Sequence, residues 1–223
     1  MMKTTYSVLF FLILLLTGCK FEERKAQERF EARKMLSDIG IEFTIDEYHS
    51  RIQEGDYSAV ELFLKAGMTP NAGNEAGQYA IYYGHLNILE LLFDHGLKPD
   101  DSGVVLTAIW VKNMDALEFL KTKGADFNKL HDRSTYGGNT ETRLPLAFAL
   151  DYNRIGRGAN ATGYGTFGGQ YSRYDKKYYE IAEFLVNNGA TFSGWVFGET
   201  PMRDVYVTSE LEERAPSLYR KLR

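Results

Sequence analysis

Several patterns in this sequence are of a kind that carries chemistry in other proteins. Residues 163–168 read Gly-Tyr-Gly-Thr-Phe-Gly, which has the spacing of a dinucleotide-binding loop. Such a loop must leave a strand and open a helix, whereas this one interrupts two expected helices. The four histidines show no metal-ligand spacing, and no serine elbow or second thiol is present. Four glutamates recur at one helix position, which favours helix-face residues over paired catalytic acids: Glu61, Glu90, Glu118 and Glu183. We therefore expect no enzyme activity, cofactor or metal.

The single cysteine points to a different chemistry. An uninterrupted apolar run, Val8–Leu16, follows the basic Lys3 and leads directly into Leu16-Thr17-Gly18-Cys19. The run is shorter than the roughly 20 residues that a bilayer-spanning helix needs, but it suits the core of a signal peptide. Small residues before the thiol let a peptidase approach the backbone. We interpret residues 1–18 as a signal peptide and Cys19 as a lipidation site. An ordinary cleaved signal or a short anchor helix is the alternative.

This segment resembles the lipobox of bacterial lipoproteins, in which the cysteine takes a diacylglycerol. Lys20, rather than Asp, follows the cysteine, and the resemblance therefore implies a palmitate-type anchor in the outer membrane, on its periplasmic face. Residues 19–40 are dense in charges of both signs, which predicts a solvated tether that becomes helical toward its end. Binding of the tether to anionic lipid is the alternative. Four apolar residues of the tether are expected to dock on the domain: Phe30, Met35, Leu36 and Ile39.

Composition limits the rest of the chain, residues 19–223, to one domain with a sizeable core. Removing the signal peptide changes the formal net charge from −4 to −5, because Lys3 is lost. A chain without basic character is a poor partner for nucleic acid. With its one cysteine lipidated, the domain has no disulfide and must depend on packing. Tyr and Phe together number 29, and some of these rings are expected on a surface that meets a partner.

An internal repeat organises residues 41–223. When Gly67, Gly96, Gly124 and Gly189 are aligned, apolar residues recur five and four positions before each glycine, and Asn, Asp or Ser recurs four positions after it. Each segment therefore predicts an amphipathic helix that ends at a left-handed glycine. The apolar residues that we expect to be buried are Leu62, Leu91, Phe119, Phe184 and Leu185.

These segments resemble ankyrin repeats. Residues 84–96 match the second helix of that family, residues 124–128 (Gly-Ala-Asp-Phe-Asn) match its exit, and residues 144–149 keep the core of its first-helix motif. The resemblance implies an all-α solenoid of about five short or degenerate repeats and a structural role for His85 and His95. Residues 201–222 would form a capping repeat whose leucines cover the open core: Leu211, Leu218 and Leu222.

Repeat four is longer than the fold requires. The first three glycines are evenly spaced, at positions 67, 96 and 124, whereas the step from Gly124 to Gly189 is more than twice as long. The excess predicts an enlarged hairpin finger at about 129–143 and a long insertion between two helices at about 154–177. The insertion has a net charge of about +4 and is rich in Gly and Tyr, and the hairpin adds one tyrosine and one arginine. An insertion without function is the alternative. Our candidate partner-binding residues are Tyr136, Arg143, Arg154, Arg157, Tyr164, Phe167, Tyr171, Arg173 and Tyr174.

Ankyrin arrays are usually protein-binding scaffolds, and the resemblance implies a protein partner for a chain that is monomeric when free. The layout resembles the immunity proteins that neutralise lipase (phospholipase) effectors of the type VI secretion system, which makes such an effector toxin the expected partner. A general periplasmic scaffold for an envelope or redox enzyme is the alternative, and a hydrolase built on an ankyrin base is a third. The partner is expected on the repeat-four loops or, alternatively, on the concave face.

The lipidation hypothesis is tested by Cys19→Ser. The variant lacks the thiol that takes the diacylglycerol, so it should not incorporate a radioactive or clickable palmitate and should leave the membrane fraction. Equal label on the variant and the unaltered chain would contradict a lipid at this position.

Overall fold

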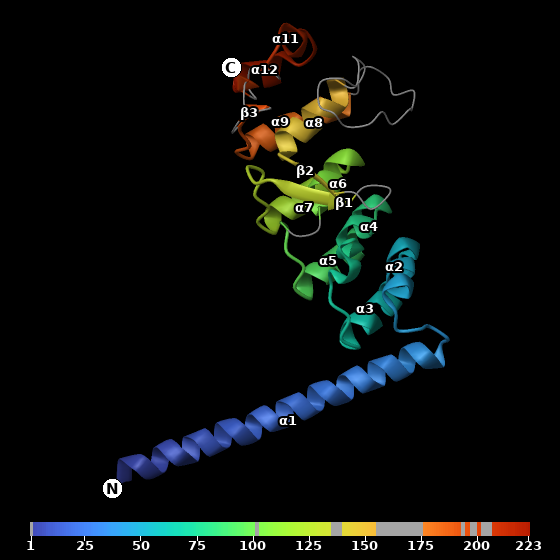
Figure 1. Ribbon diagram of the computed structural model, residues 1–223, viewed down its shortest axis with the longest axis vertical. Coiled ribbons are helices and arrows are strands. Elements are labelled where there is room, and N and C mark those ends of the chain that lie inside the picture. The colour runs from blue at the N-terminus through green and yellow to red at the C-terminus, as the bar shows by residue number, and fades with distance from the viewer. Residues whose placement is uncertain are drawn as a thin grey trace.

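A computed structural model describes residues 2–100, 103–134, 140–154, 176–192, 195–196, 200–201 and 207–223. Figure 1 shows helix pairs stacked one above the next along a single axis, with one long helix crossing beneath the first pair. That helix, α1 (Met2–Asp38), runs without a break through both the apolar segment and the charged tether. The tether is therefore helical along its length rather than only toward its end.

Five helix pairs form the stack in the part of the chain that the structure describes. The first two pairs are α2 (Ile45–Glu54) with α3 (Tyr57–Lys65) and α4 (Ala76–Tyr82) with α5 (Leu86–Asp94), joined by the short 3-10 helix η1 (Ala72–Asn74). The third and fourth pairs are α6 (Val104–Trp110) with α7 (Met114–Thr122) and α8 (Pro145–Arg154) with α9 (Lys176–Asn187). The last pair is α11 (Ser209–Arg214) with α12 (Pro216–Leu222). The predicted all-α class is confirmed.

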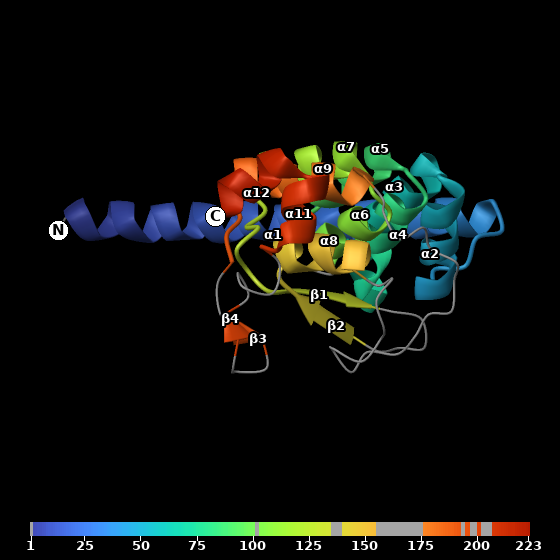
Figure 2. The same ribbon diagram turned by 90° about the horizontal axis from the view of Figure 1, so that it is seen from above.

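The described strands form two small antiparallel hairpins. Strand β1 (His131–Ser134) pairs with β2 (Thr140–Arg143), which places a hairpin within the predicted finger of residues 129–143. Strand β3 (Trp195–Val196) pairs with β4 (Thr200–Pro201) before the last helix pair. In Figure 2 the helices form two layers, with α3, α5, α7 and α9 on one side and the first helices of the pairs on the other. The hairpins project beyond the layer that contains α4 and α8.

Four second helices end in the same way because a glycine follows each of them. The four aligned glycines all have a positive φ, between 89° and 103°. In each case the next residue donates its amide proton to a carbonyl five residues earlier, as Leu97 does to Leu92 at 3.0 Å. This is the Schellman arrangement, in which a left-handed residue lets the chain turn while the last carbonyls stay hydrogen-bonded. The predicted left-handed glycines are confirmed.

The apolar positions divide into two classes. The residue four before each glycine is completely buried in all four helices: Phe63, Leu92, Leu120 and Leu185. The residue five before the glycine is buried at Leu91, but it is only half-buried in the other repeats: Leu62, Phe119 and Phe184. The prediction of burial was therefore wrong for these three side chains, which lie at the margin of the core and pack against it. A 3.6-residue period places both positions on the apolar face, but only packing selects the central one.

Two of the polar side chains four residues after the glycines, Asp100 and Asn128, hydrogen-bond to the following repeat. The Asp100 carboxylate accepts a hydrogen bond from the Asp126 amide at 3.3 Å. Asn128 donates to the Gly189 carbonyl at 2.7 Å and accepts from the Thr191 amide at 2.8 Å. These bonds cross from one repeat to the next, so Asp100 and Asn128 stabilise the spacing of the stack.

Helix α1 closes the first end of the stack by packing against α3. Ala32 and Leu36 are buried, and the Arg33 side chain donates to the Ala66 carbonyl at 3.1 Å. The Arg33 guanidinium also lies over the Phe43 ring, 4.4 Å from its centroid. Docking of Leu36 is confirmed. The prediction was wrong for three other apolar residues, which stay exposed because a different face of the helix meets the domain: Phe30, Met35 and Ile39.

The last helix pair closes the other end. Leu211 and Leu218 are buried, and Leu222 packs partly buried against the same core, as expected of a capping unit. Helix α12 is also bonded to α9, where the Glu183 carboxylate accepts from Lys221 Nζ at 2.7 Å and from Ser217 Oγ at 2.8 Å. Both ends of the apolar core are thus covered by helices.

The two burial classes predict different costs for the same substitution. Leu92→Ala should lower the free energy of unfolding by about 2–5 kcal/mol, because it removes buried methyl groups and leaves a cavity in the middle of the stack. Leu62→Ala should cost clearly less, since that side chain is only partly buried. Urea denaturation of both variants measures the difference. Equal costs would show that the assignment of central and marginal positions is wrong.

The contact between α9 and α12 predicts a dependence on pH. The hydrogen bonds from Lys221 and then from Ser217 lower the pKa of Glu183 below its ordinary value of 4.5. A carboxyl with a lowered pKa in the folded state stabilises the fold above pH 4.5, and this contribution is lost as the pH falls through the folded pKa. Glu183→Gln should cost about 0.2–1 kcal/mol at pH 7, because the groups are about a third exposed.

Unfolding of the Gln variant and the unaltered chain, followed from pH 7 into acid, gives the comparison. The difference between the two should shrink as the pH falls below 4.5. A difference that does not change with pH would contradict a charged Glu183 as its source.

Candidate functional site

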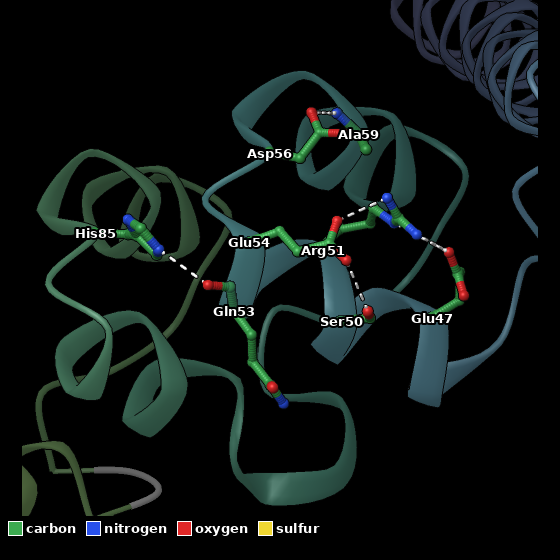
Figure 3. Close-up of polar contacts among 8 residues, drawn as sticks. All are labelled: Glu47, Ser50, Arg51, Gln53, Glu54, Asp56, Ala59 and His85. Carbon is green, nitrogen blue, oxygen red and sulfur yellow. Dashed lines mark hydrogen bonds and ion pairs between the residues drawn. The ribbon is translucent and has the colours of Figure 1, made fainter.

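The edge of the stack where each first helix passes into its second helix is built from tight turns. In the first turn, shown in Figure 3, Asp56 caps α3 by accepting from the Ala59 amide at 3.0 Å. The His85 ring of the next repeat bonds to the Gln53 carbonyl at 3.1 Å. A Cβ on Gly55 would lie 2.7 Å from a carbon of this ring, so the glycine is needed for the close approach. His85 thus locks one turn to the next.

Two further histidines also hydrogen-bond to backbone carbonyls. The buried His49 ring bonds to the Ala72 carbonyl at 2.8 Å, and the buried His131 ring bonds to the Asp126 carbonyl at 2.8 Å. His95, in contrast, is exposed. The structural role expected for His85 is therefore confirmed, and the role expected for His95 is not seen. Within the described residues, no group of three or more His, Cys, Asp or Glu side chains is placed to hold a metal ion.

Aromatic side chains gather along this same edge, over the ends of α4 and α6. The Tyr82 and Trp110 rings stack with centroids 5.4 Å apart, and Tyr83 meets Tyr82 edge-on at 5.0 Å. Tyr82 is 48% exposed and Tyr83 is 45% exposed, although both rings are large and apolar. The Tyr178 hydroxyl donates to the Trp110 carbonyl at 3.1 Å, which continues the row to the first turn of α9. We call Tyr82, Tyr83 and Trp110 the aromatic edge.

A shallow open hollow of about 490 Å³ adjoins the aromatic edge. It lies between the turn after α4 and the turn after α6, so its walls come from two successive repeats. The lining combines apolar and aromatic side chains with one lysine and one carboxylate: Ile81, Tyr82, Tyr83, Gly84, Val111, Lys112, Asn113, Met114 and Asp115. A surface of this composition resembles the centre of a protein interface more than an enclosed ligand pocket.

Lys112 occupies a position where the other repeats have glycine. Its φ is +57°, and the corresponding residues Gly55 and Gly84 have φ values of +76° and +80°. A residue with a Cβ in this left-handed conformation costs roughly 1–2 kcal/mol. The Lys112 ammonium lies 5.3 Å from the centroid of the Tyr178 ring. The lysine is thus held at the border of the hollow, on a strained turn, next to aromatic rings.

The predicted site residues lie mostly outside the part that the structure describes. Arg143 is the last residue of β2, opposite His131 in the hairpin, and is half-buried. Arg154 is the last residue of α8, and Cys19 lies within α1; only their backbones are described. The other candidates fall outside the described residues: Tyr136, Arg157, Tyr164, Phe167, Tyr171, Arg173 and Tyr174. Among the candidates whose backbone is described, Arg143, Arg154 and Cys19 lie on three different elements.

The aromatic edge and Lys112 were missed at the level of the sequence, although a signal for them was present. Gly55 and Gly84 stand the same number of positions before the glycines that end their repeats, Gly67 and Gly96. Counting back by the same number from Gly124 leads to Lys112. A lysine at a position that favours glycine is a local departure from the repeat. Tyr82 and Trp110 are as far apart in the sequence as Gly96 and Gly124. The alignment of the repeats therefore also places these two aromatic residues at equivalent positions.

Comparison with known proteins adds no family to this description. No protein-family model matches the chain, and no curated protein matches it. Within the part of the chain that the structure describes, no helix has the length and apolar character needed to cross a membrane.

Proposed function

We propose that this chain is a lipid-anchored ankyrin-repeat module that binds a protein in the periplasm and neutralises it. The proposal is supported above all by the aromatic edge, where the rings of Tyr82 and Tyr83 are exposed beside an open hollow and Tyr82 stacks on the partly buried Trp110 of the next repeat. Tyr and Trp are the residues that most often dominate the binding energy of protein interfaces. A monomer gains nothing from leaving such rings in water, so a partner surface is the simplest reason for their exposure.

Several features support the ankyrin assignment. The stack consists of helix pairs whose Schellman ends, at Gly67, Gly96 and Gly124, are almost evenly spaced along the chain, and a hairpin projects from the layer of first helices. These intervals are somewhat shorter than the repeat of the family, which is typically about 33 residues. Hydrogen bonds of Asp100 and Asn128 hold adjacent repeats together.

The N-terminal helix supports a membrane-anchored role. Helix α1 connects Cys19 to the contacts at Arg33 and Leu36, and a helix rises about 1.5 Å per residue. Residues 19–38 would therefore hold the stack within roughly 30 Å of a lipid on Cys19. An antagonist of an enzyme that attacks membrane lipids is most effective at this location. This geometry supports a phospholipase effector delivered by a type VI secretion system as the partner, at the periplasmic face of the outer membrane.

The proposal predicts a protective effect in cells. A strain that lacks this gene should lose survival when it is mixed with siblings that deliver the cognate phospholipase, and the unaltered gene should restore it. Cys19→Ser should restore survival poorly, because the unanchored protein is no longer held at the attacked membrane. Siblings that lack the effector gene are the control. Equal survival of the deletion strain and its parent would favour the alternative of a general periplasmic scaffold.

A further inference from the structure

The two charges that line the hollow differ in what they contact. The Lys112 ammonium lies over the Tyr178 ring, 5.3 Å from its centroid, so this cation already contacts the chain itself. Asp115, at the second position of α7, is exposed, and its carboxylate forms no hydrogen bond or ion pair with the described residues. The charge that the hollow presents to a partner is therefore the negative one.

The carboxylate of Asp115 is particular to this turn. The helix dipole favours a negative charge in the first turn of α7, but it would favour one equally in α3 and α5. The equivalent residues of the first two repeats, counted back from Gly67 and Gly96, are Ser58 and Asn87, which are uncharged. The fold therefore does not require a charge at this position, and among the first three repeats the carboxylate occurs only beside the hollow.

Tyr82 supplies an aromatic face in the same hollow. Its ring stacks on Trp110 at 5.4 Å and meets Tyr83 edge-on at 5.0 Å, yet it stays 48% exposed. Tyr83 is held in turn, because its hydroxyl donates to Gln53 Oε1 at 3.3 Å. A ring that is already held by its neighbours loses little freedom on binding, and its open face attracts a cation. Arginine suits both groups, since its planar guanidinium stacks on an aromatic ring while its N–H groups donate to a carboxylate.

The turn after α2 adds negative charge on the same edge of the stack. Arg51 pairs with both Glu47 and Glu54, as Figure 3 shows. The hydrogen bond to Glu47 and the charges of Glu54 and Asp56 raise the pKa of Arg51 above its ordinary value, so three carboxylates lie within electrostatic reach of one cation. This group has an excess of negative charge. At a distance it attracts a basic partner toward the edge without having to contact it.

We propose that the hollow binds an arginine side chain of the partner protein, with the guanidinium stacked on the exposed face of Tyr82 and hydrogen-bonded to the Asp115 carboxylate. Lys112 is assigned no contact with the partner. This assignment rests on the proposed protein-binding function and goes further by naming the contact residues and the chemistry of the partner. It moves the expected binding centre from the repeat-four insertion to the turn edge of repeats two and three.

The test uses a random peptide library displayed on phage, selected on the complete mature chain. Selected sequences should be enriched in arginine. Synthetic copies should bind Asp115→Asn at least about tenfold more weakly in fluorescence polarisation, because the guanidinium loses its charged partner. Glu90→Gln removes an exposed carboxylate of α5 outside the hollow and is the matched control, which should leave the affinity almost unchanged. Tyr82→Ala should weaken binding, and Tyr57→Ala, at a tyrosine of similar exposure on α3, should not.

A double-mutant cycle tests the contact itself. Replacing the peptide arginine by citrulline keeps the planar shape and removes the charge, so binding to the unaltered chain should weaken at least about tenfold. The same replacement should matter much less for Asp115→Asn, since the two changes remove one interaction. The Tm of Asp115→Asn should change little, because one exposed charge in the first turn of a helix adds little to stability.

Three results would overturn the assignment: no enrichment of arginine, equal affinity for the unaltered chain and Asp115→Asn, or additive losses in the cycle. An equal loss of binding in Glu90→Gln would also overturn it, since the peptides would then respond to net charge alone. Loss of binding only when residues 157–173 are replaced by a short Gly-Ser linker would place the contact in the insertion instead. The selection uses no phospholipase, so a failure of the immunity proposal in cells and a failure of this assignment are separate outcomes.

Discussion

The structure depends on the burial of apolar side chains between successive helix pairs. Phe63, Leu92, Leu120 and Leu185 are all fully buried, and each lies on a short helix. A pair of such short helices cannot cover its own apolar face, so each pair is stable only against its neighbours. The same requirement explains why the described chain has a helix cap at each end, α1 at the first and α12 at the last.

The stacking also creates the aromatic edge. Repeats of nearly equal length place equivalent residues side by side, so Tyr82 at the end of α4 meets Trp110 at the end of α6. The rings are held from behind, since the Trp110 carbonyl accepts from the Tyr178 hydroxyl. Side chains on rigid helix ends lose little freedom when a partner binds. A scaffold built for packing thus provides a preorganised contact surface at its turn edge, without a loop of special length.

The sequence predicted the repeat boundaries well, because glycine at a left-handed position is a local signal that does not depend on the neighbours. It predicted depth of burial less well: Leu62 and Leu92 both lie on apolar helix faces, and only the three-dimensional stack decides which is central. The docking of α1 was wrong for Phe30 and Met35 for a related reason. Apolar character suggested them, but Ala32 and Leu36, with Arg33 bonded to Ala66, select a different face.

The candidate site was predicted least well, because composition draws attention to the wrong segment. The repeat-four insertion is unusual in length, charge and aromatic content, whereas Tyr82, Trp110 and Lys112 lie in ordinary repeats. What distinguishes Lys112 is its backbone conformation, which becomes evident once Gly55 and Gly84 are seen to adopt the same turn. A departure from a repeat is informative only after the structural role of the repeated residue is known.

In the proposed function, the turn edge of the stack contacts the partner protein. The most direct measurement is photo-crosslinking in living cells, with benzoyl-phenylalanine placed at position 82 in one strain and at position 57 in another. Both positions hold tyrosines of comparable exposure in the free chain. On arrival of the phospholipase effector, we expect a crosslinked band that contains the effector from position 82 and none from position 57. A band from position 57 alone, or equal bands from both, would contradict a partner docked on the aromatic edge.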